Sequence, residues 1–274
     1  MGIWRSREGL WVGVGTVKLG LRRWIGRRIG RWVAAWLFYT AVPLPHQWPV
    51  TFQAIARLAP AIGVIIGGGL GVLDWGLAQI GLPLWPRMAV VVAAWVWITG
   101  GLHLDGAMDA ADGLAVMDPE RRLVVMADSA TGAFGAIALG IVLLLKVTAL
   151  GSLGEAHRWM GLVAAAGWGR WGQLMAIARY PYLKPEGKGK FHREEIQGWR
   201  EGLMPGFGLL LVSAGDGMWT GEWIWAGAMA AGGMAIALGV GFWFYRQLGG
   251  HTGDTYGAVV EWTEALLLLW GTLW

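Results

Sequence analysis

Three aspartates follow a long apolar stretch in the segment GGLHLDGAMDAADGL, which runs from Gly100 to Leu114. Asp105, Asp109 and Asp112 are spaced i, i+4 and i+7, so on an α-helix their side chains lie within one narrow stripe. Three carboxylates on one stripe repel one another, and their charges are costly near lipid. Because a divalent cation offsets that repulsion, the spacing predicts a Mg²⁺ site, in which Mn²⁺ can substitute. The plain alternative is a solvated helix face just outside a bilayer.

Other polar residues extend this predicted site. His103 precedes the first aspartate by two positions, where its imidazole is a candidate general base or orients a carboxylate. The alternative for His103 is an ordinary polar group at a helix end. Asp128 and Ser129 begin a second polar segment just before another apolar run, and Ser129 is a candidate phosphate- or substrate-binding residue. Asp128 is either an N-terminal cap of the next helix or a metal ligand that completes a two-ion site.

Two later segments have the composition of phosphate-binding loops. Residues 179–193, RYPYLKPEGKGKFHR, combine prolines that keep the chain extended with lysines, although the spacing is not that of a P-loop. A solvated basic loop attracted to anionic lipid is the alternative. Residues 248–264, LGGHTGDTYGAVVEWTE, place hydroxyls and a carboxylate at the start of a helix, which suits phosphate or ribose. Glu261, further along that helix, is a candidate supporting residue. The candidate phosphate- or nucleotide-binding residues of these two segments are Arg179, Lys184, Lys188, Lys190, Thr252, Asp254 and Thr255.

The elements that must position these residues are apolar helices. The 274 residues are 55% hydrophobic and 15% charged, with 46 glycines and 21 tryptophans, and the mean hydropathy is +0.48. This composition argues against an ordinary soluble domain and predicts an integral membrane protein. The absence of cysteine excludes disulfides and thiolate metal sites. We therefore predict an all-α, polytopic transmembrane bundle of about seven spans, each of roughly 20 apolar residues. The qualifying stretches are 54–80, 86–104, 131–152, 157–178, 203–220, 222–244 and 256–274.

The N-terminal part of the chain gives the predicted orientation. Residues 1–31 contain eight Lys and Arg against one acid and are predicted to be a basic cytoplasmic tail rather than a nucleic-acid-binding arm. Residues 32–49 are apolar but short and contain three prolines, so we interpret them as an interfacial or re-entrant segment, and whether they cross stays open. Residues 32–274 then form one membrane domain. With the tail inside, the excess of positive charge in the following loops predicts that all the polar segments above share the cytoplasmic face. Those loops are 105–130, 179–202 and 245–255.

Taken in order, these segments resemble the cobalamin synthase family, the adenosylcobinamide-GDP ribazoletransferases. FYTAVPLP (Phe38–Pro45) is similar to the family's F-x-T-R-L-P-x-P, and GGLHLDGAMDAADGL to its GG-x-H-x-DG-x-x-D-x-x-DG. MADSATGAFG is similar to M-x-DS-x-x-G-x-x-G, and LGGHTGDTYGAVVE to GG-x-TGD-x-x-GA-x-x-E. RYPYLKPEGKGKF stands where the family has an Arg-Tyr followed by a G-x-G-x-x-F-like loop. The resemblance covers most of residues 38–264. The chain departs from it at Ala41, where arginine is usual, and at Ala127 and Ala130, where basic residues are frequent.

The resemblance implies the last step of nucleotide-loop assembly in vitamin B12 biosynthesis. In that reaction adenosylcobinamide-GDP and α-ribazole, or its 5′-phosphate, give adenosylcobalamin, or its 5′-phosphate, and GMP. It also implies a Mg²⁺-dependent transferase of the bacterial inner membrane whose partners are these small molecules and the bilayer, with no nucleic acid. A ribose hydroxyl must break a phosphoanhydride, which suits a metal held by the aspartates, with Asp105 as the catalytic carboxylate and His103 as the candidate base. The oligomeric state stays open.

Two other functions compete with this interpretation. A CDP-alcohol phosphotransferase is also a membrane enzyme with an aspartate stripe, but its D-G-x-x-A-R opening is absent, because Asp105-Gly106 is followed by Ala107-Met108-Asp109. A cation transporter is the less favoured alternative. Its acids should lie near the bilayer midplane on broken helices, whereas here they gather at one predicted face with basic loops.

Overall fold

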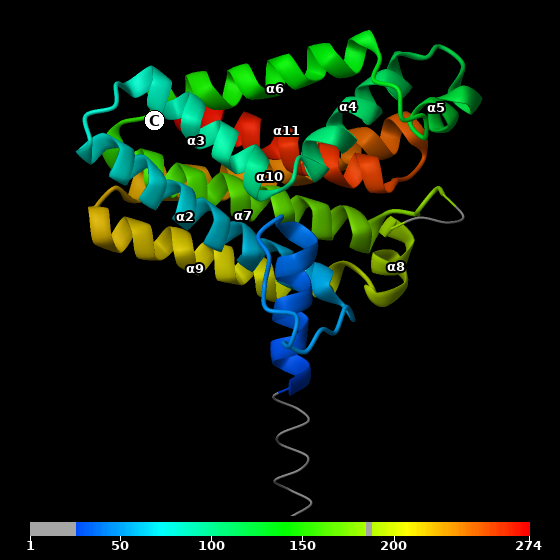
Figure 1. Ribbon diagram of the computed structural model, residues 1–274, viewed down its shortest axis with the longest axis horizontal. Helices are drawn as coiled ribbons and strands as arrows, with labels where there is room; N and C mark the ends of the chain where they lie inside the picture. Colours follow the sequence, from blue (N-terminus) through cyan, green and yellow to red (C-terminus); the bar gives the residue numbers. More distant parts are fainter. Residues whose placement is uncertain (1–25, 185–187) are drawn as a thin grey trace, which may run out of the picture.

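The computed structural model describes residues 26–184 and 188–274, without the side chain of Lys188, and this part of the chain is a bundle of helices (Figure 1). One isolated β-bridge is its only extended pairing among the described residues. The all-helical architecture predicted from composition is therefore confirmed. The long helices are α2 (Ala59–Gln79), α6 (Ala133–Ser152), α7 (Glu155–Arg179), α9 (Leu203–Thr220), α10 (Trp223–Leu248) and α11 (Gly253–Gly271). The shorter ones are η1 (Ile55–Leu58), α3 (Leu84–Ile98), α4 (Leu102–Ala115), α5 (Pro119–Val125), α8 (Lys188–Glu195) and η2 (Trp199–Gly202).

Helix α7 lies at the centre of the bundle. It packs mainly against α2, α10 and α11, and most of its side chains are buried on every side. A helix that is buried all round is normally apolar all round. The buried positions of α7 nevertheless include Arg158, Arg170 and Gln173, so these polar side chains require partners or ligands inside the bundle.

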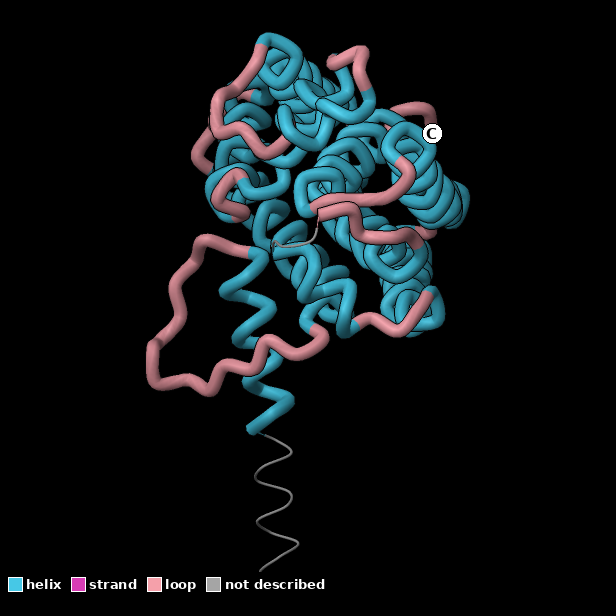
Figure 2. The backbone as a smooth tube through the Cα atoms, turned by 90° about the vertical axis from the view of Figure 1, so that its right-hand side faces the viewer, coloured by secondary structure: helices cyan, strands magenta, loops and turns pink. Residues whose placement is uncertain are grey.

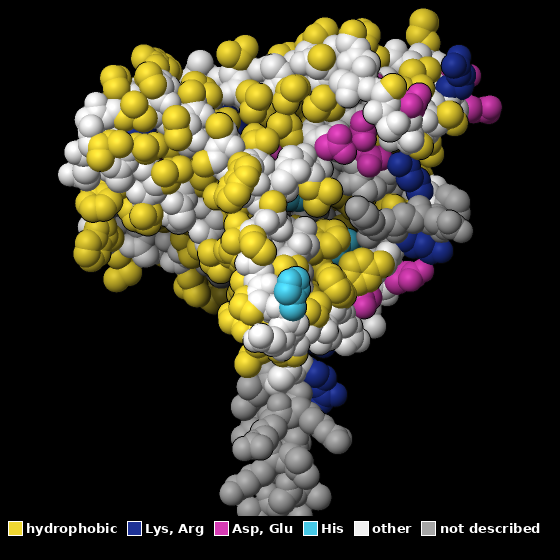
Figure 3. Space-filling view, in the orientation of Figure 1, with side chains coloured by type: hydrophobic (Ala, Val, Ile, Leu, Met, Phe, Trp, Pro, Cys, Tyr) yellow, Lys and Arg dark blue, Asp and Glu magenta, His cyan; other side chains and the backbone are white. Residues whose placement is uncertain are grey.

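The outer surface supports insertion in a membrane. Among the described residues, three helical stretches are long and apolar enough to cross a bilayer, namely Ile55–Gln79, α6 and α10, and α3 with α4 makes a fourth if that bent pair is one span. Large apolar side chains such as Trp75, Leu144 and Trp219 are exposed. On the face in Figure 3, charged side chains gather at the end of the bundle where α5 and α8 lie, and hydrophobic side chains cover the opposite end.

The predicted stretch 86–104 is a broken helix, which corrects the expectation of one straight segment. Helix α3 ends at Ile98, and the chain turns by 90° into α4. Gly100 and Gly101 form the turn with φ angles of 61° and 68°, a backbone conformation that is accessible to glycine at no steric cost. Helix α4 then contains Asp105, Asp109 and Asp112 without interruption, so the predicted helical stripe is confirmed.

The segment before η1 contains a helix, residues 26–39, that lies across the long helices rather than parallel to them (Figures 1 and 2). Residues 40–54 are irregular, and Figure 2 shows them looping away from the bundle. A backbone hydrogen bond of 2.9 Å from Thr51 N to Gly30 O closes this loop. The predicted boundary at residue 31 falls inside the helix, and the rest of the predicted tail, residues 1–25, lies outside the described residues.

Candidate active site

Helices α4 and α11 cross at backbone contact, because glycines occupy the crossing. A Cβ at Gly106 would lie 2.5 Å from the carbonyl oxygen of Asp254, and one at Gly257 would lie 2.9 Å from the carbonyl oxygen of His103. Neither position has room for a side chain. The close approach brings the His103–Asp105 end of α4 against the start of α11, so the first and last polar segments of the sequence meet.

A cavity of about 250 Å³ lies at this crossing. Its walls come from α4, α7, α8, α11, the segment after α7 and the helix at residues 26–39. Asp105, Lys184 and Asp254 are its charged lining residues, and each is exposed or only half-buried. The Nζ of Lys184 donates a 2.8 Å hydrogen bond to Oδ2 of Asp254. The charges therefore lie at the mouth of the cavity.

Asp105 and Asp109 present the carboxylates most available to a ligand. No hydrogen bond or ion pair holds either carboxylate in the described part of the chain, and Asp109 interacts electrostatically with Asp105, Asp254 and Lys184. Within residues 26–184 and 188–274, no three carboxylate or imidazole groups are arranged to hold a metal ion by themselves. Asp105 lines the cavity, whereas Asp109, one turn further along α4, does not. These two carboxylates nevertheless fit Mg²⁺, which commonly takes one or two protein carboxylates and completes its shell with water and phosphate oxygens.

Asp112 contacts a neighbouring helix instead of the cavity. Its Oδ2 accepts a hydrogen bond from Gly132 N at 2.7 Å, and its Oδ1 accepts one from Gly135 N at 2.8 Å. These amides belong to the N-terminus of α6, whose own N-cap residue, Gly132, has no side chain. Asp112 thus satisfies orphan amides and complements the helix dipole. Its predicted role as a metal ligand stays a prediction.

Asp128 and Ser129 lie exposed in the loop between α5 and α6, and neither lines the cavity. The Oδ1 of Asp128 accepts a 3.1 Å hydrogen bond from Ala130 N within its own turn. The alternative in which Asp128 caps α6 is therefore wrong, because Asp112 supplies that carboxylate from α4. The role of Asp128 as a metal ligand stays a prediction.

The predicted basic residues do not all lie at the cavity. Lys184 lines the cavity, whereas Arg179 is exposed at the end of α7 and does not. Lys190 is exposed on α8, with its Nζ 3.9 Å from Oε1 of Glu194. The side chain of Lys188 lies outside the described residues. Lys184 is thus the one predicted cation that the described structure brings to the cavity.

The threonines of the last polar segment hold the start of α11. Thr252 and Thr255 form a capping box, in which Thr255 N donates to Thr252 Oγ1 at 3.2 Å and Thr252 N donates to Thr255 Oγ1 at 2.8 Å. Both threonines are buried and neither lines the cavity. Thr252 Oγ1 also donates to Oδ2 of Asp254 at 3.2 Å. The capping box therefore holds the carboxylate of Asp254, which lines the cavity, in position.

His251 joins the two loops that flank the mouth. It forms a parallel bridge with Tyr182, in which Leu183 N donates to His251 O at 2.8 Å and His251 N donates to Pro181 O at 2.9 Å. Its ring nitrogens lie 3.1 Å from Thr255 Oγ1 and 3.1 Å from Gly241 O. Burial lowers the pKa of His251 to about 4, so the ring is neutral near pH 7.

The predicted supporting residue Glu261 belongs to a buried ion-pair network deeper in the bundle. Lys146 Nζ lies 2.6 Å from Oε2 of Glu261 and 2.6 Å from Oε2 of Glu264, and Arg170 Nη1 lies 2.8 Å from Oε1 of Glu264. Lys146 also lies 4.4 Å from the ring centroid of Trp95. The network pairs these buried charges and ties α6, α7 and α11 together.

The inner wall of the cavity contains residues that the sequence argument largely missed. His103, Gln173, His192 and Tyr256 are only 2%, 6%, 4% and 2% exposed, and each has at least one polar side-chain atom without a partner among the described residues. His103 is where the motif predicted it. The sequence offered a signal for two of the others: Gln173 is a polar residue in an apolar helix, and His192 lies at the end of the lysine-rich segment.

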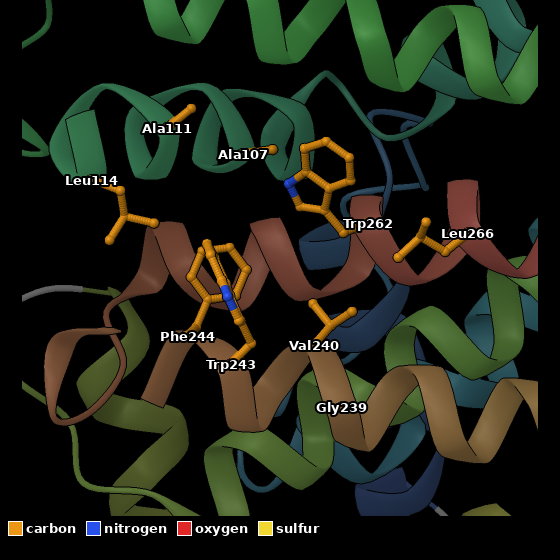
Figure 4. A pocket seen from close by; sticks show the side chains of 9 residues that line it. All are labelled: Ala107, Ala111, Leu114, Gly239, Val240, Trp243, Phe244, Trp262 and Leu266. Carbon is orange, nitrogen blue, oxygen red and sulfur yellow. The ribbon is translucent and has the colours of Figure 1, made fainter. Parts of the chain in front are cut away.

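A larger groove on the opposite face of α4 is apolar throughout (Figure 4). It has a volume of about 530 Å³ and lies between α4, α10 and α11. Its lining includes Ala107, Ala111, Trp243, Phe244 and Trp262. No group that could move a proton or bind phosphate lines it, so the smaller, polar cavity is the candidate active site.

Comparison with known proteins agrees with the motifs at this cavity. A family model described as cobalamin-5-phosphate synthase matches residues 31–272. A relative from Trichormus variabilis, named adenosylcobinamide-GDP ribazoletransferase, is 56% identical over 86% of this chain and 94% of its own. Relatives of the same name from Synechocystis and Synechococcus elongatus are 48% and 49% identical, over 90% and 85% of this chain and 94% and 92% of theirs. No solved structure matches the chain.

Proposed function

The chain belongs to the cobalamin-5-phosphate synthase family, and from that membership we propose the reaction that takes place at the cavity between α4 and α11. Adenosylcobinamide-GDP and α-ribazole, or its 5′-phosphate, are joined to give adenosylcobalamin, or its 5′-phosphate, with release of GMP. A ribose hydroxyl of the ribazole forms the new P–O bond, and the phosphoanhydride bond to GMP breaks. Such transfers depend mainly on positioning and charge neutralisation, which the mouth of the cavity is suited to provide.

The residues of the cavity have distinct roles in this proposal. Asp105 and Asp109 would hold Mg²⁺, or Mn²⁺ in its place, at the diphosphate. Such an ion would neutralise charge on the phosphate oxygens and increase the acidity of the attacking hydroxyl. Lys184, positioned by Asp254, contacts a phosphate oxygen. His103, whose two ring nitrogens have no partner among the described residues, accepts the proton of the ribose hydroxyl.

The remaining predicted contacts belong to the same proposal. Ser129 and the cations that do not line the cavity would approach the nucleotide only if their loops close over the bound substrate. Thr252 and Thr255 contribute through the turn that holds Asp254 in place. Glu261 supports the site from below through its ion pair with Lys146. The predicted cations concerned are Arg179, Lys188 and Lys190.

We further propose that α2, α3, α6, α7, α9, α10 and α11 cross the inner membrane of a bacterium, with the cavity open to the cytoplasm. The distribution of cations supports this orientation. The opposite end contains Arg87 and Arg158, and both pair with Asp74, at 3.0 Å and 3.3 Å. Beyond residue 31, the loops at the cavity end contain most of the other basic residues, and several of these are exposed.

The observation that carries the proposed reaction is that Asp105, Lys184 and His103 line one cavity in a chain of this family. The Asp105 carboxylate and the His103 ring have no hydrogen-bond partner among the described residues. The test is GMP release by protein purified in detergent, with both substrates, in the presence of Mg²⁺ or of a chelator. Asp105→Asn should lower kcat/KM more than about a hundredfold, because even outer-shell partners of a metal are worth about 10–100-fold. Asp118→Asn, at an exposed cap of α5, is the matched control. Full Mg²⁺-dependent activity in Asp105→Asn would refute the metal assignment, and a wild type that forms no GMP would refute the reaction.

A further inference from the structure

The floor of the cavity differs from its mouth in both charge and burial. The charged lining residues, Asp105, Lys184 and Asp254, are at least partly exposed, whereas the buried polar lining residues are two histidines, a glutamine and a tyrosine. Burial lowers the pKa of His192 to about 4, so this ring is neutral near pH 7. The floor therefore offers neutral hydrogen-bonding groups and no ionised carboxylate from the residues described as lining it.

These buried groups carry polar atoms that no described residue satisfies. Both ring nitrogens of His103 and of His192, the Oε1 of Gln173 and the hydroxyl of Tyr256 have no partner among the described residues. Buried polar atoms are hydrogen-bonded in the large majority of cases, so several orphans on one cavity wall require an explanation. A ligand that supplies the missing partners provides one.

Aromatic rings from two separate clusters line the same cavity. In the first cluster, Phe38 meets His192 edge to face at 4.7 Å, and Tyr39 stacks between His103 and His192 at 6.3 Å and 6.4 Å. In the second, Tyr182 stacks with Tyr256 at 6.0 Å. Phe38, His103 and His192 from one cluster, and both tyrosines of the other, line the cavity. Aromatic walls of this kind bind flat ring systems by stacking.

We propose that this aromatic floor binds the base of α-ribazole, a flat and uncharged benzimidazole. This inference rests on the proposed function. The volume of about 250 Å³ is below the about 300–1,000 Å³ typical of pockets for drug-sized ligands, so the floor holds one ring system and not both substrates. The free ring nitrogen of the base accepts a hydrogen bond from a floor residue, and the apolar edges of the base contact the aromatic rings.

The position of His103 favours the ribazole base over the guanine of the other substrate. His103 lies on the floor, two residues before the carboxylate of Asp105 at the mouth. The ribose of α-ribazole is attached directly to its base, so a base on the floor places the attacking hydroxyl beside the imidazole. The guanine is separated from the reacting phosphorus by a ribose and a phosphate and leaves with them. Among the described lining residues, the floor also has no carboxylate for guanine's N–H donors.

The test separates the two substrates. Phe38→Leu keeps an apolar side chain but removes the ring, and it should raise both the KM and the Kd for α-ribazole about tenfold. Tyr256→Phe keeps the ring, removes only an unpartnered hydroxyl and should raise them a few-fold. The KM for adenosylcobinamide-GDP should change less than twofold in either variant. Phe207→Leu, at an exposed position of α9 away from the cavity, should change nothing.

The Kd is measured by equilibrium dialysis of α-ribazole against the purified protein in detergent, without the second substrate. If Phe38→Leu fails to fold, Tyr256→Phe decides the question, because its only change is the loss of that hydroxyl. An unchanged Kd for α-ribazole in the folded variants overturns the inference. So does a selective rise in the KM for adenosylcobinamide-GDP, which assigns the floor to guanosine. In both cases the wild type still releases GMP, whereas failure of the proposed function would abolish that release in the wild type itself.

Discussion

Asp112→Asn should reduce the stability of the protein more than its response to Mg²⁺. The carboxylate of Asp112 accepts hydrogen bonds of 2.7 Å and 2.8 Å from two amides at the start of α6. Asparagine keeps one acceptor oxygen but turns an NH₂ group toward the other amide. The loss of one hydrogen bond to a charged group costs about 1.5–3 kcal/mol, and the loss of charge at the helix N-terminus about 0.3–1 kcal/mol more. The expected decrease in the free energy of unfolding is about 2–4 kcal/mol.

Thermal unfolding in detergent, followed by circular dichroism, measures this change. For a chain of this size, about 1 kcal/mol corresponds to roughly 2–4 °C, so Tm should fall by about 5–15 °C. Asp105→Asn is the matched comparison, because its carboxylate has no hydrogen-bond partner among the described residues, and it should change Tm little. The Mg²⁺ concentration at half-maximal GMP release, measured at a temperature where both variants are folded, should rise for Asp105→Asn and stay unchanged for Asp112→Asn.

The opposite pattern would refute this reasoning. If Asp112→Asn unfolds at the wild-type temperature and needs far more Mg²⁺, then Asp112 is a metal ligand. In that case its contacts with the two glycine amides contribute little to stability.

Two further predictions concern buried charge and pH. Lys146→Met should lower the free energy of unfolding by about 3–5 kcal/mol, because it leaves the buried carboxylate of Glu261 unpaired and removes one of the two cations that pair with Glu264. A variant with the wild-type Tm in detergent would contradict this. The pKa values of His192 and His251, lowered to about 4 by burial, lie below the about 6.5 of an unfolded histidine, so the unfolded state binds more protons between these values. The free energy of unfolding should therefore fall as pH drops from about 6.5 to about 4. His192→Phe should show a smaller difference between unfolding curves measured at pH 7.5 and at pH 5. If the difference equals that of the wild type, His192 is not a source of the pH dependence.

The sequence was informative where local periodicity determines structure. The stripe of aspartates at i, i+4 and i+7 predicted one helix, and α4 contains it without a break. Apart from 86–104, each apolar stretch coincides with helical structure, because burial and lipid exposure both favour long runs of apolar residues. The same criterion missed the break in 86–104, since Thr99-Gly100-Gly101 carries no charge and a window of about 20 residues averages over three positions. The turn there depends on positive φ angles, which hydropathy does not register.

Interactions between distant segments could not be predicted from composition. Asp128 stands beside α6 in sequence and was a reasonable cap, but the carboxylate that caps α6 is Asp112, 20 residues before Gly132. The residues of the cavity floor were missed for a related reason. Gln173 and Tyr256 line the cavity only because α7 and α11 bring them to its wall in the folded chain.

The glycine contact between α4 and α11 also has a consequence for the order of assembly during synthesis. Helix α11 follows all the other described helices in the chain, so it leaves the ribosome after them. Until it packs, Lys146 lacks its carboxylate partners, and α4 lacks the surface against which Gly106 packs. A nascent chain therefore contains every aspartate of α4 and still has no closed cavity. The walls of the cavity therefore come together in one late step of assembly, when α11 packs against α4.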